Sequence, residues 1–384
     1  EYCWKLEDAN ASSDRIYKTI IYDDEDLDAA FNTPHETDVN LQTLEIAFDR
    51  TCQFACSYCN PAFSTAWVRD IKRNGAYEHL VSDGRNHFTH PHDSSQRYTP
   101  DEVNPYAEAF FAWWESDLHK TLKELRITGG EPLATRNFMK LLDFVAQNHN
   151  PNLTLVVNTN LCVPDKNLDM FFEKATTLLN AKTIKGLEVY TSMDTWGKRA
   201  EYIRTGLDLK VWEENFHTYL QNTNSPITFM ITFNIFSVTT FKSFLEKFIE
   251  WRKQYGWYDD PVNPQHRVRF DTPYLREPLQ YDINILPKEQ FMPYMYEALE
   301  YMKANTDDKR SDAFSSIEYE KFKRVVDYMA ETEYSDSKLV EGRRDFYNWF
   351  NELDERRETD MLSVFPEMLG FYRMCQEVNQ LHPK

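Results

Sequence analysis

The segment that most constrains this chain is residues 44–67, LEIAFDRTCQFACSYCNPAFSTAW. It opens on a short apolar run, which predicts a buried strand. Directly after this run come Cys52, Cys56 and Cys59, spaced C-x3-C-x2-C. Three thiolates on a loop that leaves a strand can bind three irons of a cubane [4Fe–4S] cluster, and the fourth iron is then left without a protein ligand. An open iron is what a cluster needs if it is to bind and reduce a substrate.

The composition excludes several classes of protein. The 384 residues include 43 Lys and Arg against 62 Asp and Glu, a formal net charge of −19, which argues against broad binding of nucleic acid. Six cysteines, three of them in one loop, do not suggest a disulfide framework and suit a reducing compartment. No apolar run approaches the length of a membrane span, and residues 1–20 contain no signal-peptide core. We therefore expect a soluble, cytoplasmic, globular protein with no membrane partner.

The middle of the chain alternates predicted strands with predicted helices. The strands are expected at residues 44–48, 124–128, 153–159, 186–193, 227–236 and 267–272, and the helices at 62–74, 138–147, 168–179, 199–220 and 241–255. Repeated βα units of this kind imply a parallel sheet, either doubly wound or curled as a barrel. Six units are too few for the closed eight-stranded barrel.

Changes in composition and in apolar periodicity along the sequence predict three regions. Residues 1–43 form an acidic N-terminal lead-in, and residues 44–286 form the α/β domain with a long insertion at 60–122. From residue 287 to 384 the pattern changes to long amphipathic helices, which predict a helical C-terminal cap on the sheet.

Polar residues follow the predicted strands where each one ends. Gly129, Gly130 and Glu131 follow the second strand, and Asn158, Asn160 and Cys162 close the third; Ser192 and Asp194 close the fourth. Because parallel α/β sheets bind their ligands at the carboxyl ends of the strands, we expect these residues to meet the cysteine loop. Thr232, Asn234 and Asp271 would line the substrate side if their side chains point inward.

The C-x3-C-x2-C loop, followed by GGEP at the end of the next strand, resembles the signature of the radical S-adenosylmethionine (radical SAM) superfamily. The resemblance implies a partial (β/α)6 TIM-like barrel and two cofactors, a [4Fe–4S] cluster and S-adenosylmethionine. It implies that a flavodoxin- or ferredoxin-type partner donates one electron, and that S-adenosylmethionine is cleaved reductively. The 5′-deoxyadenosyl radical would then abstract hydrogen from a peptide or small-molecule substrate.

The resemblance also assigns roles to individual residues. Cys52, Cys56 and Cys59 would bind the cluster, with Tyr58 beside them at the cofactor. The Gly129–Glu131 segment would receive the amine of S-adenosylmethionine, since glycines let the backbone approach closely. Ser192 and Asp194 suit the ribose hydroxyls, and Arg204 suits the carboxylate. Asn158 or Asn160 would reach the ribose or the carboxylate, and Cys162 is a candidate hydrogen-atom donor to the substrate radical.

Related enzymes often carry a SPASM or twitch domain with auxiliary clusters at the C-terminus. The corresponding region here holds only Cys375, so it offers no obvious auxiliary-cluster ligand set.

Three other functions share part of the pattern. A non-catalytic iron–sulfur carrier would need four cysteines per cubane, and the loop has three. A structural zinc site usually completes four ligands, and none is evident nearby. Radical SAM modification of RNA is disfavoured by the acidic charge.

Overall fold

The computed structural model describes residues 24–37, 39–81, 88, 104–258 and 265–382. The chain divides into two compact units, residues 1–41 and 42–384. The described part of the first unit contains one helix, α3 (Asp24–Asn32). Most of the predicted lead-in and part of the predicted insertion lie outside the described residues. All further description concerns the second unit, and in it no described helix is long and apolar enough to cross a membrane.

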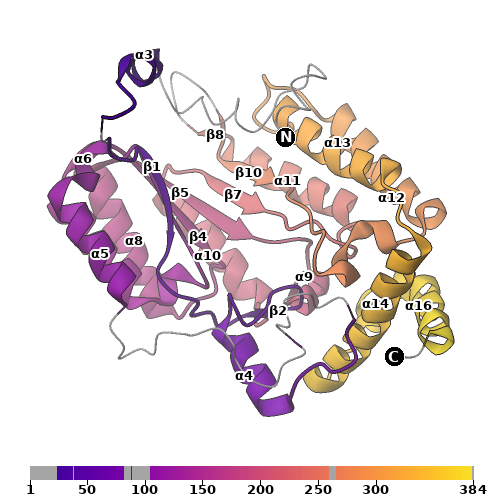
Figure 1. Ribbon diagram of the computed structural model, residues 1–384. Coiled ribbons are helices and arrows are strands. Elements are labelled where there is room, and N and C mark those ends of the chain that lie inside the picture. The colour runs from indigo at the N-terminus through magenta and orange to yellow at the C-terminus, as the bar shows by residue number, and fades with distance from the viewer. Residues whose placement is uncertain (1–23, 38, 82–87, 89–103, 259–264, 383–384) are drawn as a thin grey trace. The chain divides into compact units, whose positions relative to one another are not determined.

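Six parallel strands form the sheet at the centre of this unit (Figure 1). Their order is β1-β3-β4-β5-β7-β10, and every neighbouring pair is parallel. The strands are β1 (Thr43–Ala47), β3 (Glu124–Thr128), β4 (Asn150–Thr159), β5 (Ile184–Ser192), β7 (Ile227–Met230) and β10 (Val268–Asp271). This confirms the predicted α/β class with six parallel strands. No described strand joins β1 to β10, so the curl into a partial barrel stays a prediction.

Helices connect the strands in sequence. They are α4 (Thr65–Asn74), α5 (Pro105–Trp113), the π-helical turn η2 (Trp114–Leu118), α6 (His119–Thr121), α7 (Arg136–Gln147), α8 (Asp165–Asn180), α9 (Lys198–Ile203), α10 (Leu209–Asn222) and α11 (Phe241–Tyr255). Short elements complete this part: β2 (Ala55–Cys56), β6 (Arg204–Thr205), β8 (Trp257–Tyr258), β9 (Gln265–His266), and the 3-10 turns η3 (Pro132–Ala134), η4 (Leu279–Tyr281) and η5 (Ile283–Ile285).

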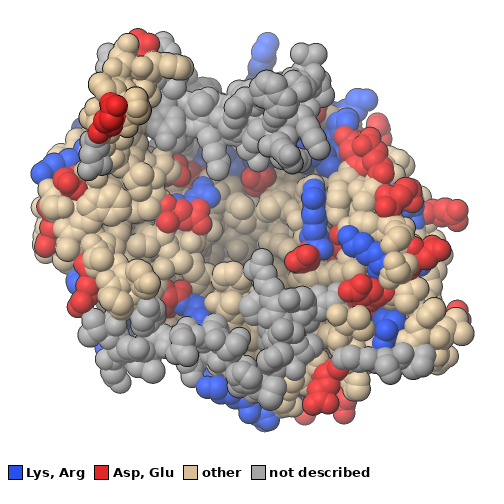
Figure 2. Space-filling view, viewed as in Figure 1, with Lys and Arg blue, Asp and Glu red and all other residues tan. Residues whose placement is uncertain are grey.

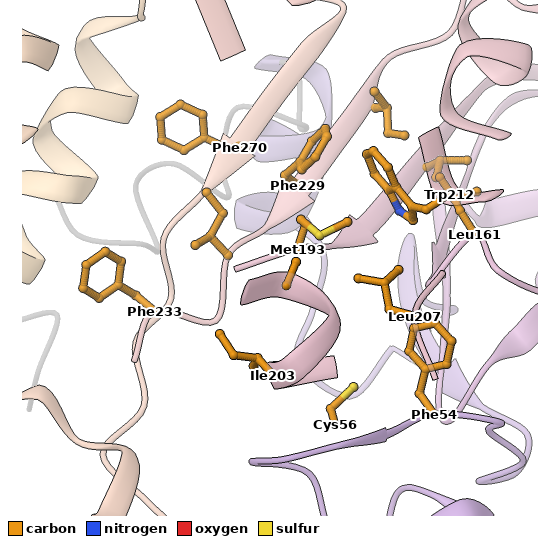
Figure 3. Packing of buried hydrophobic residues seen from close by; sticks show 14 of the residues in the cluster. Phe54, Cys56, Leu161, Met193, Ile203, Leu207, Trp212, Phe229, Phe233 and Phe270 are labelled. Atoms are coloured by element: carbon orange, nitrogen blue, oxygen red, sulfur yellow. The ribbon is translucent and has the colours of Figure 1, made fainter. Parts of the chain in front are cut away.

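The two faces of the sheet differ in polarity because side chains alternate along each strand. One face is apolar and packs under the helices. Phe229 in β7, for example, contacts Phe248 and Trp251 of α11 at ring distances of 4.8 and 5.1 Å. Figure 3 shows Phe229 between Phe270 and Trp212, with Cys56 at the lower margin of the same cluster. The apolar core therefore extends from the sheet to the cysteine loop.

The opposite face, which we call the open face, carries polar residues. Thr128, Asn158 and Ser192 lie on it near the strand ends, with charged residues further back along the strands. Figure 2 shows that the middle of this side of the molecule is hollowed, over β4, β5 and β7 in the view of Figure 1.

Several predicted elements differ by a few residues at their ends, and two differ more substantially. The strand predicted at 227–236 ends at Met230, and the segment that follows turns: Asn234 Nδ2 donates to the Thr232 carbonyl and Asn234 Oδ1 accepts from Phe236 N. Ile235 and Phe236 are fully buried, so their apolar character reflects burial and not a strand.

The helix predicted at 199–220 is two helices, α9 and α10. Between them Gly206 has a φ of +107°, and a Cβ there would lie 2.9 Å from Phe54 Cδ1. Glycine is required because this conformation and this close approach both exclude a side chain.

The described C-terminal part consists of helices, and its predicted role as a cap on the sheet stays a prediction. Its elements are α12 (Lys288–Ala304), α13 (Ser316–Glu331), α14 (Asp336–Arg357), α15 (Met361–Val364), η6 (Pro366–Met368) and α16 (Leu369–Leu381). Phe346, Trp349 and Phe350 of α14 are fully buried, and Trp349 Nε1 donates to Tyr281 Oη at 2.8 Å. These helices belong to the same compact unit as the sheet.

Candidate functional site

A cavity of about 200 Å³ lies at the carboxyl ends of the strands. Most of the predicted site residues line it, although they come from segments far apart in the sequence. They are Cys52, Cys56, Tyr58, Cys59, Gly129, Gly130, Asn158, Asn160, Ser192 and Arg204. Thr232, expected on the substrate side, also lines this cavity, together with Phe54, Phe63, Thr128 and Thr159, which the sequence did not single out.

The cysteine loop is fixed by the helix that follows it. Ser64 caps α4, and its hydroxyl also donates to the Phe54 carbonyl at 2.6 Å. Thr65 Oγ1 donates to the Cys52 carbonyl and accepts from Cys52 N. Trp67 Nε1 donates to the Cys56 carbonyl at 2.9 Å. The sequence directly after the cysteines therefore holds the backbone between them.

The three cysteines are free thiols in a poorly solvated place. Burial, and secondarily the neighbouring Cys56, raises the pKa of Cys52 to about 12, and burial likewise raises the pKa of Cys59 to about 12. Burial also raises the pKa of Cys56. Metal binding would deprotonate all three, because thiolates are the ligand form.

Among the described residues, no group of three or more His, Cys, Asp or Glu is arranged to hold a single metal ion. A cubane makes a different demand, since each of three thiolates would bind a different iron. Three cysteines that line one cavity without converging on one point provide a donor set of that kind.

The glycine pair packs directly on the cysteine loop. Gly130 N donates to the Asp49 carbonyl and Glu131 N donates to the Thr51 carbonyl, at 3.2 and 2.6 Å. A Cβ added at Gly130 would lie 2.3 Å from the Thr51 oxygen. At Gly129, where φ is +121°, a Cβ would lie 2.6 Å from the Asp49 oxygen. Glycine is needed here for contact between two backbones.

Glu131 does not line the cavity. Its carboxylate is buried and accepts from Thr159 Oγ1, Asn160 N and Leu133 N at 2.7, 2.6 and 3.1 Å. Burial raises its pKa to about 7, although these hydrogen bonds oppose the rise. The carboxylate thus ties the glycine segment to the end of β4, and its predicted contact with the amine of S-adenosylmethionine gains no direct support from this position.

Asp194, Arg204 and Tyr58 form one buried group beside the thiols. Asp194 accepts from Arg204 Nη2, Tyr58 Oη and Thr232 N, each at 2.9 Å. Burial raises the pKa of Asp194, and the Arg204 guanidinium counteracts this effect. Because three protein donors occupy the carboxylate, Asp194 orients Arg204 and Tyr58, and the ribose contact predicted for it stays a prediction.

Two buried polar atoms at the cavity have no hydrogen-bond partner among the described residues. They are Oδ1 of Asn158 and Nε of Arg204. Arg204 Nη1 also lies 3.8 Å from the Cys56 sulfur, and Asn160 Nδ2 lies 4.0 Å from the Cys52 sulfur. Buried polar atoms usually have partners, so the unpaired acceptor and donor suit a polar ligand next to the thiols.

Cys162 and Asn234 are not brought to the cavity. Cys162 Sγ lies 3.5 Å from the Asp208 carbonyl, and its backbone N donates to Asn160 Oδ1. Asn234 is fully buried and its amide is occupied by the turn that ends β7. Asp271 lies on the open face and pairs with Lys321 of α13 at 2.8 Å.

Comparison with known proteins adds little to this geometry. No protein-family model matches the sequence, and no curated protein matches it. The chain is similar to a solved structure described as the crystal structure of Streptococcus suis SuiB bound to S-adenosylmethionine, with 13% identity and a TM-score of 0.43. The alignment covers 78% of this chain and 56% of that one, so this chain spans little more than half of SuiB. A likeness this weak carries no argument, and the function must be inferred from the chain's own residues.

Proposed function

We propose that this chain is a radical SAM enzyme. Cys52, Cys56 and Cys59 would bind a [4Fe–4S] cluster, and S-adenosylmethionine would occupy the adjoining part of the same cavity. The observation that carries the proposal is the meeting of the three thiols with the glycine pair and with polar side chains from the ends of β4 and β5. A cysteine loop that only bound a structural metal would have no need of this polar lining.

When bound, the cluster would supply one electron for the reductive cleavage of S-adenosylmethionine into methionine and a 5′-deoxyadenosyl radical, and that radical would abstract hydrogen from the substrate. The chain's own residues would bind and orient S-adenosylmethionine. The unpaired donor Arg204 Nε suits the carboxylate of S-adenosylmethionine, and the unpaired acceptor Asn158 Oδ1 suits its amine or a ribose hydroxyl. Asp194 and Tyr58 hold the Arg204 side chain in place.

The test is iron and sulfide content after anaerobic reconstitution, together with release of 5′-deoxyadenosine on adding dithionite and S-adenosylmethionine. We expect about four irons per chain in the wild type, and loss of both iron and deoxyadenosine in Cys52→Ala/Cys56→Ala/Cys59→Ala. Cys375→Ala is the matched control and should keep both. Four irons without deoxyadenosine would instead indicate a non-catalytic iron–sulfur protein.

We also propose that an external flavodoxin- or ferredoxin-type protein donates the electron, and that the substrate is a peptide or a small molecule. Cys162 would act as hydrogen-atom donor only if the substrate radical can reach its thiol. Cys162→Ala should then still release deoxyadenosine. Its product should either keep the stereochemistry of the substrate or be a side product derived from the radical. Normal product from this variant would remove Cys162 from the reaction.

A further inference from the structure

We propose that the substrate of this enzyme carries a carboxylate, and that Arg126 binds it at the floor of the hollow in the open face. This inference rests on the proposed function, because it names the class of substrate that would meet the cofactor cavity. Arg126 lies on β3 and has no part in the cavity described above.

The register of the strands places Arg126 directly behind that cavity. It precedes Thr128, a residue of the cavity lining, by two positions on the same strand and the same face. Two residues of a strand span about 7 Å. A group bound to Arg126 would therefore leave the neighbouring atoms of the same molecule facing the cofactor.

The side chain of Arg126 points toward the middle of the sheet. Its guanidinium carbon lies 4.4 Å from the centre of the Tyr190 ring on β5, so the side chain reaches past the intervening strand β4. Glu45 is its cross-strand neighbour on β1, but the two form no ion pair, and the Glu45 carboxylate accepts from Thr128 Oγ1 instead. The guanidinium is thus directed into the hollow and away from the sheet edge.

Among the described residues, the side chain of Arg126 has no hydrogen-bond partner and no ion pair, and its Nε is buried without a partner. The Tyr190 ring beneath it is neutral, since burial raises the pKa of Tyr190 to about 12. The ring holds the guanidinium through its π face and leaves the planar fork of N–H donors available. An unpaired guanidinium whose Nε is shielded from solvent is a receptor for an anion.

Two other cations that reach this face, in the part of the chain that the structure describes, form ion pairs with carboxylates. Arg269 of β10 pairs with Glu188 of β5 at 2.5 Å, and the same carboxylate accepts from Thr228 Oγ1 at 2.7 Å. Lys321 pairs with Asp271 at 2.8 Å. One unpaired guanidinium matches one negative charge, so a carboxylate fits better than a doubly charged phosphate, which would need a second free cation.

The experiment follows the Nε–H resonance of Arg126 in protein labelled with nitrogen-15 at arginine Nε, and assigns it by its loss in Arg126→Gln. The probes are butyrate, as a small acid with one carboxylate, and a blocked tripeptide with a central glutamate. Their uncharged controls are butyramide and the glutamine tripeptide. We expect one or both acids to shift the Arg126 resonance, and neither amide to do so. Which acid shifts it distinguishes a small-molecule carboxylate from a peptide one.

The affinity of each acid for the variants provides the second readout. Losing a charge-assisted contact should weaken binding by about 10- to 100-fold in Arg126→Gln. Arg126→Lys keeps the charge but loses the planar fork of donors, so its affinity should lie between those of the wild type and Arg126→Gln. Arg373→Gln changes an exposed position of α16, and its affinity should equal that of the wild type. An Arg126 resonance that neither acid moves, or equal affinity in Arg126→Gln and Arg373→Gln, would overturn the inference.

Neither readout needs the cluster or S-adenosylmethionine, so this inference and the proposed function can fail separately. Deoxyadenosine release with no carboxylate binding would leave the proposed function and remove the substrate class. Carboxylate binding without deoxyadenosine release would leave an anion site and remove the radical chemistry.

Discussion

The contact between Gly130 and the cysteine loop can be tested by adding one methyl group. In Gly130→Ala the new Cβ would lie 2.3 Å from the Thr51 oxygen, and ordinary contact begins at about 3.4 Å. One of the two backbones must therefore move by about 1.1 Å, the difference between these distances. Neither can yield as a flexible side chain would, because the three nearest atoms all belong to the backbone of Arg50 or Thr51.

The loss in free energy of unfolding can be worked out from the contacts that this movement disturbs. Overpacking of this kind typically costs 1–3 kcal/mol. The movement also strains two hydrogen bonds, Gly130 N to Asp49 O and Glu131 N to Thr51 O, each worth about 1 kcal/mol. We expect Gly130→Ala to lower the free energy of unfolding of the cluster-free protein by about 3 kcal/mol. We also expect a lower iron content after reconstitution, since Cys52 directly follows the displaced residue.

The assay is anaerobic urea denaturation, followed by iron analysis of the folded variant. Gly370→Ala is the matched control, because Gly370 lies exposed in α16 and a Cβ there meets nothing within 4 Å. It should raise the stability by about 0.4–1 kcal/mol and leave the iron content unchanged. The reasoning is refuted if Gly130→Ala is as stable as Gly370→Ala and binds as much iron.

Two further changes test the buried charges. Asp194→Asn leaves the buried Arg204 charge without its partner, and should lower the free energy of unfolding by about 3–5 kcal/mol. The control Glu214→Gln, in an exposed ion pair, should change that free energy by less than about 0.5 kcal/mol. Equal losses of stability in the two variants would contradict this prediction. The pKa of Glu131 is about 7, above its ordinary value, so the folded chain binds the extra proton and this group's contribution to stability falls as pH rises from about 4.5 to 7. The stability of Glu131→Gln relative to wild type should rise over that window, and a pH-independent difference would contradict it.

The cysteine and glycine residues of the site could be predicted from sequence because their signals are local. A C-x3-C-x2-C spacing and a glycine pair at a strand end each describe one short segment, and the order of the strands brings them to one edge of the sheet. Short apolar runs identified all six strands for the same reason.

The hydrogen-bond partners of the charged residues could not be predicted, because they depend on contacts between distant segments. Glu131 binds the end of β4 and Asp194 binds Tyr58 of the cysteine loop, and neither partner is visible in the local sequence. Arg126 gave no signal either, since a single arginine in an alternating strand is ordinary. What identifies Arg126 as a candidate anion-binding residue is that none of the described residues around it provides a carboxylate partner. The overlong strand at 227–236 has a related cause, since burial selects apolar residues in a turn as well as in a strand.

The central claim is that the three thiols and S-adenosylmethionine share one cavity, so that the open iron of the cluster binds the cofactor. The most direct test is the electron paramagnetic resonance spectrum of the reduced, reconstituted protein with and without S-adenosylmethionine. We expect a cluster signal that changes when S-adenosylmethionine is added, and no cluster signal in the triple cysteine variant. A cluster signal that S-adenosylmethionine leaves unchanged would show that the cofactor does not bind the open iron.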